Sequence, residues 1–256
     1  MDITILGAHN TESKDTGLVT LLIDDILAID AGALTSRLSF AEQLKLKAIL
    51  LTHQHYDHIR DIPAIGMNYF IRQKTLDIYG IPPVYESLAA HMLHEDIYSN
   101  FLEIPAGKPT IRFNSLEPGR EDIIHGYNVL PIPVDHSKPT VGFFITSANG
   151  KTMFYTSDTG PRLSDVWRSV SPQLLIIETT APSEFEDAAI EKKHLTPSLL
   201  EKELQNFNDI KGYLPPTVLV HMNPSEEEII QKEIAKVAAR LGASIKLGYE
   251  GMRLQI

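Results

Sequence analysis

The N-terminal part of the chain alternates short apolar runs with polar residues. Residues 1–6 predict a strand, and residues 18–23 and 26–30 predict a hairpin that turns at Asp24 and Asp25. Ser39 and Glu42 have the spacing of a capping box, so a helix is expected over residues 40–46. The fully apolar residues 48–51 are typical of a buried strand. This part therefore predicts strands with one intervening helix.

The pattern is least regular between residues 67 and 118. A helix is expected to begin within residues 59–65, followed by a strand at 76–79, a helix at 83–93 and a strand at 110–116. His91 and His94 fall at the end of the second helix. Helical histidines without a nearby third ligand are more often surface or packing residues than ligands, and we expect that here.

In the second half, short strands end in polar residues. They are expected at 127–134, 141–146, 151–156, 174–177 and 217–220. Helices are expected before Lys193, from Pro197 to about 207 with Thr196 as its cap, and from Ser225 to about 241. Strands that alternate with helices place their ends on one rim of a sheet, where α/β proteins usually bind ligands. The strand ends are therefore the places to look for chemistry.

The strand at 48–51 ends at a dense group of potential metal ligands. His53, His55, Asp57 and His58 lie within six residues. A polar loop with hydrogen-bonded histidines is the alternative, and it would be the better explanation for a single His. Later strand ends add three further candidates, His136, Asp158 and His221. Glu178 and His194 form a second tier of candidates. Seven such ligands exceed one tetrahedral ion but suit two ions that share a carboxylate, for which Asp158 is the natural bridge.

Composition narrows the possibilities further. At 256 residues with 43% apolar residues, the chain is expected to form one domain over residues 1–256. The net charge of −10 disfavours a long nucleic acid as partner. Because there is no cysteine, any metal must be held by His, Asp, Glu or water. No uninterrupted apolar segment predicts an export signal or membrane span, so a cytoplasmic protein without a membrane partner is expected.

The ordered set of motifs resembles the metallo-β-lactamase superfamily over the whole chain. It comprises His53-x-His55-x-Asp57-His58, a lone His136, Asp158 in a Ser-Asp-Thr-Gly turn, and His221 after a buried strand. The resemblance implies an α/β protein with a four-layer αβ/βα sandwich and two divalent metal ions, zinc first, with manganese or iron as alternatives. It implies one ion on His53, His55 and His136, a second on Asp57, His58 and His221, and Asp158 between them.

Two further segments, 177–182 and 193–197, are similar to a motif pair in the phosphodiesterase branches of that superfamily. These are the class II cyclic-nucleotide phosphodiesterases and, more distantly, ribonuclease Z. The resemblance implies that Glu178 orients His194 toward a phosphate oxygen or the leaving group. The alternative is that Glu178 is a surface acid and His194 caps a helix. The chain departs from the class II pattern at Asp61, where a small residue is expected, and in residues 181–183.

The resemblance therefore implies a binuclear-metal hydrolase, specifically a phosphodiesterase acting on small phosphodiesters such as cyclic nucleotides. Asp57 would orient the attacking water, and His194, held by Glu178, would assist where charge develops. One alternative is hydrolysis of a lactone, β-lactam or thioester, and a second is ribonuclease activity on a tRNA precursor. A third is a di-iron centre that binds or reduces oxygen. A small-molecule phosphodiester is the expected partner, and a homodimer is left open.

Overall fold

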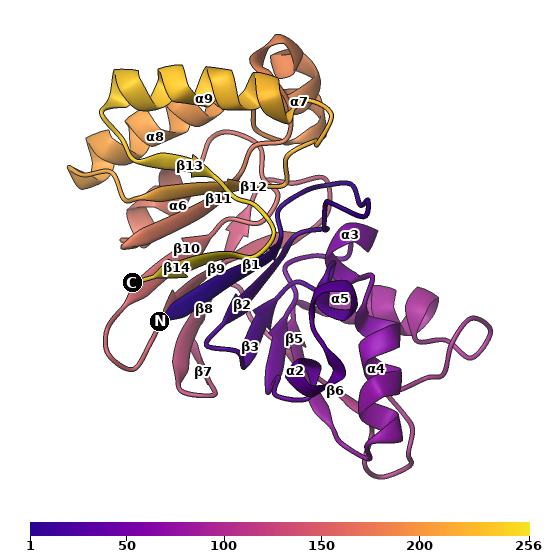
Figure 1. The fold of residues 1–256 in the computed structure, drawn as a ribbon. Helices are drawn as coiled ribbons and strands as arrows, with labels where there is room; N and C mark the ends of the chain where they lie inside the picture. Colours follow the sequence, from indigo (N-terminus) through magenta and orange to yellow (C-terminus); the bar gives the residue numbers. More distant parts are fainter.

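The computed structural model describes residues 1–256 as two seven-stranded sheets with helices on their outer faces (Figure 1). The first sheet has the order β14-β1-β2-β3-β4-β5-β6. Its strands are β1 (Asp2–Gly7), β2 (Thr20–Ile23), β3 (Leu27–Ile29), β4 (Ala48–Leu50), β5 (Leu76–Gly80), β6 (Ile111–Ser115) and β14 (Met252–Gln255). Strands from β14 to β3 pair antiparallel, and strands from β3 to β6 pair parallel.

The second sheet repeats this mixed arrangement in the order β13-β12-β11-β10-β9-β8-β7. Its strands are β7 (Asp122–Ile124), β8 (Tyr127–Val134), β9 (Thr140–Thr146), β10 (Thr152–Tyr155), β11 (Leu174–Glu178), β12 (Thr217–Val220) and β13 (Ile245–Leu247). The strands from β7 to β10 pair antiparallel, and those from β10 to β13 pair parallel. Strands β8, β10, β11 and β12 therefore run in one direction, and their carboxyl ends share one edge.

Helices cover the outer face of each sheet (Figure 1). Beside the first sheet are α1 (Leu34–Arg37), α2 (Phe40–Gln43), α3 (Tyr56–Ile59), α4 (Ile62–Ile71), α5 (Pro82–Ser87) and the π-helical turn η1 (Leu88–Met92). Over the second sheet are α6 (Ser164–Ser169), the 3₁₀ turn η2 (Ser183–Phe185), α7 (Glu186–Lys192), α8 (Pro197–Lys211) and α9 (Glu227–Leu241). The predicted αβ/βα sandwich is confirmed. None of these helices combines the length and apolarity needed to cross a membrane.

Strand β11 shows how an apolar run is used on both faces of a sheet. Leu174 and Ile176 join a core of 45 buried residues that draws on both sheets. Leu175 and Ile177 join a second core of 18 buried residues, which includes side chains of the covering helices. Successive side chains of a strand point to opposite faces, so a strand buried on both faces must be apolar throughout.

The structure changes the bounds of several predicted elements. The capping box at Ser39 is present, because Ser39 accepts from the Glu42 amide and Glu42 accepts from the Ser39 amide. The helix it begins, however, ends at Gln43 instead of residue 46. The helix expected at 83–93 is divided between α5 and η1, and α8 extends to Lys211.

Six short elements were missed: α1, α3, α6, β7, β13 and β14. Strand β14 pairs with β1, about 250 residues away in the chain. Such a pairing leaves no local periodic signal.

Candidate metal centre

The seven predicted ligands come together from four segments of the chain. Four of them follow β4, and His136, Asp158 and His221 follow β8, β10 and β12 respectively. Because β8, β10 and β12 run in the same direction, their carboxyl ends deliver these side chains to one edge of the second sheet. The segment after β4 in the first sheet meets them there.

A strand, a loop and a short helix carry the ligands that follow β4. Thr52 anchors the loop, because its backbone amide and its hydroxyl donate to Asp30 at 2.9 and 3.0 Å. His55 has extended backbone and precedes the first residue of α3. Asp57 and His58 therefore lie in the first turn of α3. The first pair of ligands on this segment therefore belongs to one group of potential ligands and the second pair to another.

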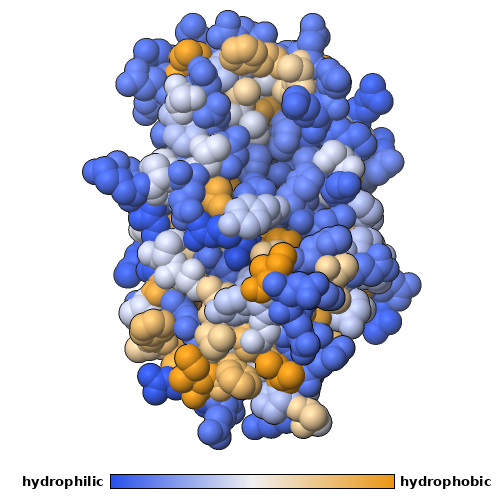
Figure 2. All heavy atoms as spheres, turned by 90° about the vertical axis from the view of Figure 1, so that its right-hand side faces the viewer, coloured by the Kyte–Doolittle hydropathy of each residue, from blue (hydrophilic) through white to orange (hydrophobic).

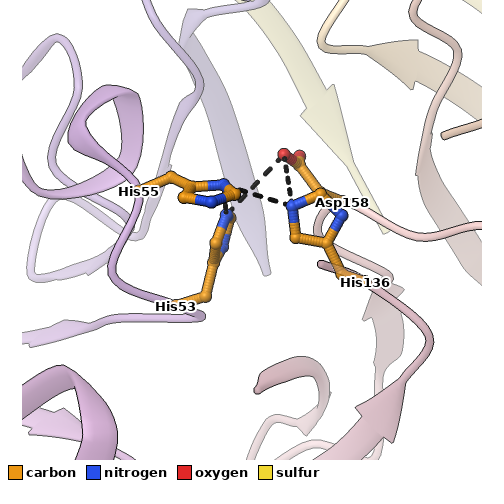
Figure 3. A group of neighbouring side chains, drawn as sticks. All are labelled: His53, His55, His136 and Asp158. Carbon is orange, nitrogen blue, oxygen red and sulfur yellow. Dashed lines mark hydrogen bonds and ion pairs between the residues drawn. The ribbon is translucent and has the colours of Figure 1, made fainter. Parts of the chain in front are cut away.

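The first group of ligand atoms is drawn in Figure 3. Nδ1 of His55 lies 3.0 Å from Nε2 of His53 and 3.2 Å from Nε2 of His136. Oδ2 of Asp158 lies 3.7 Å from His53 Nε2 and 3.8 Å from His136 Nε2. A tetrahedral ion with bonds of about 2.0–2.1 Å needs ligand atoms about 3.3 Å apart. The four side chains therefore fit one ion.

The second group has the same spacing. Nε2 of His58 lies 3.4 Å from a carboxylate oxygen of Asp57 and 3.4 Å from Oδ1 of Asp158. Nε2 of His221 lies 3.2 Å from Asp57 Oδ2 and 3.3 Å from Asp158 Oδ2. Asp158 is common to the two groups. The geometry thus has the same division of ligands that the resemblance implies.

Hydrogen bonds to the outer ring nitrogens orient two of the histidines. Nδ1 of His58 donates to the carboxylate of Asp30 at 2.7 Å. Nδ1 of His136 donates to the backbone carbonyl of Lys193 at 3.2 Å. Since the proton is on the outer nitrogen, the inner Nε2 presents a lone pair to the centre, as a metal-binding histidine must.

Two threonine hydroxyls fix the rings of His53 and His221 in the same way. Thr52 donates its proton to Asp30 and so accepts from Nδ1 of His53 at 3.1 Å. Thr180 donates to Glu178 and accepts from Nδ1 of His221 at 2.8 Å. The inner nitrogens of these two rings are therefore also lone-pair donors.

The centre contains buried polar atoms that form no hydrogen bond within the protein. Nε2 of His58 and Oδ1 of Asp158 are buried without a hydrogen bond, which ordinarily costs about 1–3 kcal/mol per atom. Burial alone would lower the pKa of His58, but three carboxylates, Asp158, Asp30 and Asp57, raise it well above its usual range. The surroundings thus favour positive charge at this point. Imidazole and carboxylate ligands suit divalent zinc, manganese and iron, so the residues fit divalent metal ions.

Glu178 lies at the carboxyl end of β11, is fully buried, and accepts hydrogen bonds from four donors. The donors are the amides of Thr159 and Leu195, the hydroxyl of Thr180, and Nδ1 of His194, the last at 2.7 Å. Glu178, His194 and His221 are close enough to hold an ion. Because Glu178 already bonds His194, we interpret them as a hydrogen-bonded pair.

His194 lies beside the centre and reaches solvent. Its ring stacks on that of His221 with centroids 5.2 Å apart, and its side chain is 18% exposed. Burial alone would lower the pKa of His194, but the Glu178 carboxylate outweighs this and raises it to about 9. The imidazole is therefore placed to donate a hydrogen bond or a proton into the open side of the centre.

The centre opens into a cleft of about 500 Å³. Figure 2 shows this side of the molecule, where mostly hydrophilic side chains border the hollow at mid-height. Besides four of the ligands and His194, the cleft is lined by Asn10, Thr11, Glu12, Leu18, Tyr56 and Arg60. His91 and His94 are exposed elsewhere and join neither group of ligands.

The sequence reasoning missed Asp30 and Thr180, which orient ligands, and Glu12 and Arg60, which line the cleft. Asp30 follows the buried strand β3, and this is the same strand-end signal that identified Asp158. It could have been found that way. Glu12 lies in a polar loop, where local sequence gives no sign of its neighbours.

A sequence model described as "Beta-lactamase superfamily domain" matches residues 21–247. Two ribonuclease Z proteins are similar in part. That of Methanothermobacter thermautotrophicus is 34% identical over 106 residues, which are 38% of this chain and 33% of the relative. That of Thermococcus kodakarensis is 27% identical over 157 residues, which are 56% of this chain and 47% of the relative. The matches thus span a third to about half of the relatives' length.

Solved structures resemble the chain over its whole length. Yeast PDE1 has a TM-score of 0.84 at 16% identity, covering 100% of this chain and 99% of that one. YhfI from Bacillus subtilis has a TM-score of 0.77 at 17% identity, covering 99% and 98%. The short form of human tRNase Z has a TM-score of 0.69 at 18% identity, covering 100% and 99%. At these identities the likeness shows the fold.

Proposed function

The chain belongs to the β-lactamase superfamily, and from this premise we propose that it is a binuclear-metal phosphodiesterase acting on small phosphodiesters such as cyclic nucleotides. The observation that carries the proposal is the position of His194, which Glu178 holds beside the ligand cluster and at the wall of the cleft. A metal centre alone would serve many hydrolases. A buried carboxylate with a paired histidine beside it suits a reaction that develops charge on phosphoryl and leaving-group oxygens.

The ligand assignment is part of the proposal. His53, His55 and His136 would hold one ion, Asp57, His58 and His221 the other, and Asp158 would be shared. Zinc is the first candidate, with manganese or iron as alternatives. When bound, such a pair of ions lowers the pKa of a shared water and neutralises charge on the phosphoryl oxygens.

The protein's own groups would complete the reaction. Nδ1 of His194 is engaged by Glu178, so Nε2 is the atom left to donate to a phosphoryl oxygen or to the departing oxygen. The carboxylate of Asp57 also lines the cleft, and it would accept a hydrogen bond from the attacking water and orient it. Hydrolysis of a lactone, β-lactam or thioester would use the same cluster but gives the Glu178–His194 pair no role.

The experiment compares metal-loaded wild type with His194→Ala on 3′,5′-cyclic AMP, because its alkoxide leaving group needs a proton to depart. Loss of general acid assistance should slow turnover by about 10²–10⁴-fold, while metal content stays unchanged. His91→Ala is the matched control, because that histidine is exposed and belongs to neither group of ligands. Equal turnover by His194→Ala would remove the residue from the mechanism. Faster wild-type turnover of nitrocefin or a lactone would replace the phosphodiesterase proposal.

A second candidate function is cleavage of RNA, which the sequence similarity to two ribonuclease Z proteins favours. Against it stand the net charge of −10 and the cleft, whose single Lys or Arg side chain, Arg60, is ion-paired. Proteins that hold long nucleic acids need free cations along the phosphates. Salt-dependent binding and cleavage of a tRNA precursor would favour this candidate over the small phosphodiester. An absorption spectrum and metal analysis would identify the remaining alternative, a di-iron centre.

A further inference from the structure

The cleft contains an unusual balance of charge for a site that would bind a phosphodiester. Arg60 is its only lysine or arginine, whereas Glu12, Asp57 and Asp158 all contribute carboxylates. Asp57 and Asp158 belong to the ligand groups, where bound ions would balance them. Glu12 does not, and it lies on the wall formed by the loop that follows β1. The effect of Glu12 on the charge of the cleft therefore depends on the group with which it pairs.

Two carboxylates fix the guanidinium of Arg60. Nε donates to Oδ1 of Asp61 at 2.9 Å, and Nη1 forms an ion pair with Glu12. Asp61 is only 3% exposed, and its other oxygen accepts from the amide of Thr35 at 2.7 Å. Asp61 is also the position at which the sequence departs from the small residue of the class II pattern. In this chain, the carboxylate of Asp61 holds the guanidinium of Arg60 in place.

Glu12 is the more exposed partner of this ion pair. Its side chain is 37% exposed, compared with 16% for Arg60. An ion pair as open as this contributes little to stability, about 0–1 kcal/mol. The loop is anchored by other contacts, because Asn10 donates to the carbonyl of Met222 and Thr16 to the carbonyl of Thr11. The main physical effect of Glu12 is therefore on the charge of the cleft.

We infer that Glu12 is a specificity-determining residue, which restricts the cleft to phosphodiesters that carry a single negative charge. By pairing with Arg60, Glu12 neutralises the one lysine or arginine of the cleft that could balance a second phosphate beside the scissile one. A substrate with that second charge would meet a carboxylate instead, and an unpaired charge of this kind is an effective way to reject a partner. The inference rests on the proposed phosphodiesterase activity.

The experiment uses two chromogenic substrates that differ by one phosphate. They are the p-nitrophenyl ester of thymidine 5′-phosphate and the same ester with a 3′-phosphate. The metal-loaded wild type should favour the singly charged ester. Glu12→Gln leaves Arg60 free to bind the added phosphate, so the ratio of kcat/KM should shift toward the ester with the 3′-phosphate by about five- to tenfold. Using the ratio within each variant cancels differences in the amount of active protein.

Two variants make the result specific. Asp15→Asn removes the same charge from the same loop, but Asp15 is 74% exposed, contacts Lys14 and does not line the cleft. Its ratio should equal that of wild type. Glu12→Gln combined with Arg60→Met should lose the gain, because the freed guanidinium is absent.

An unchanged ratio in Glu12→Gln, or a gain that survives in the double variant, would overturn the inference while leaving the phosphodiesterase activity intact. If the wild type turns over neither ester, the proposed function fails, and the inference fails with it.

Discussion

Replacing Asp30 tests quantitatively how hydrogen bonds from outside the centre hold the second group of ligands. This carboxylate is fully buried after β3. It accepts from Nδ1 of His58 at 2.7 Å, from the amide of Thr52 at 2.9 Å and from the Thr52 hydroxyl at 3.0 Å. It therefore fixes the outer proton of a proposed ligand and the loop that carries His53.

Asp30→Asn keeps the size of the side chain but replaces one acceptor oxygen with a donor. If the amide oxygen stays with Thr52, its NH₂ group faces Nδ1–H of His58, and the ring must move that proton to Nε2. A protonated Nε2 cannot bind a metal. Loss of such an outer partner typically weakens metal affinity by about 10–100-fold, which corresponds to about 1.4–2.7 kcal/mol.

The assay is the metal content of zinc-loaded protein equilibrated with chelators of graded affinity. Wild type should hold two ions, and Asp30→Asn should release one of them at about 10–100-fold higher free zinc than wild type does. Asp77→Asn is the matched control, because Asp77 is also buried and accepts a hydrogen bond, from Arg112. Asp77 lies near the amino end of β5, however, whereas Asp30 follows the carboxyl end of β3 at the opposite edge of the sheet. Unchanged release of both ions, or equal weakening of both, would refute the reasoning.

Three further predictions address the shared carboxylate, the histidine beside the centre and the fold. Asp158→Ala should retain neither ion in metal analysis, because Asp158 belongs to both groups of ligands; full retention of either ion would show that it is not shared. In the metal-free protein, the pKa of His194 is raised to about 9 from 6.5 despite burial, so its protonated ring stabilises the fold below about pH 6.5, and this contribution is lost as the pH rises through about 9. The difference in the free energy of unfolding between wild type and His194→Gln should shrink by roughly 3 kcal/mol from about pH 6 to about pH 10, and a constant difference would contradict the assignment. Glu203→Ala removes the buried acceptor of the Arg162 and Leu163 amides and of Trp167 Nε1. It should lower the free energy of unfolding by about 3 kcal/mol or more, measured in urea titrations followed by Trp167 fluorescence. A loss under about 1 kcal/mol would refute this role of Glu203.

The candidate ligands could be predicted from the sequence for a physical reason, whereas the sandwich was implied by the resemblance of their ordered set to a known superfamily. Apolar runs such as residues 48–51 and 217–220 are interrupted by histidine or aspartate where a strand leaves the core, and that contrast is local. The ion pair of Glu12 with Arg60 joins residues 48 positions apart, and the pairing of β14 with β1 joins the two ends of the described chain. Local patterns carry no information on such contacts. The single domain, the cytoplasmic location and a homodimer stay predictions.

The central claim is that two ions share Asp158 beside His194. A crystal structure of the metal-loaded protein with a bound phosphate analogue, with metals identified by anomalous scattering, tests it most directly. We expect two anomalous peaks, one among His53, His55 and His136 and one among Asp57, His58 and His221, with Asp158 bound to both and His194 on a phosphate oxygen. A single peak, peaks elsewhere, or an analogue that does not contact His194 would contradict the account.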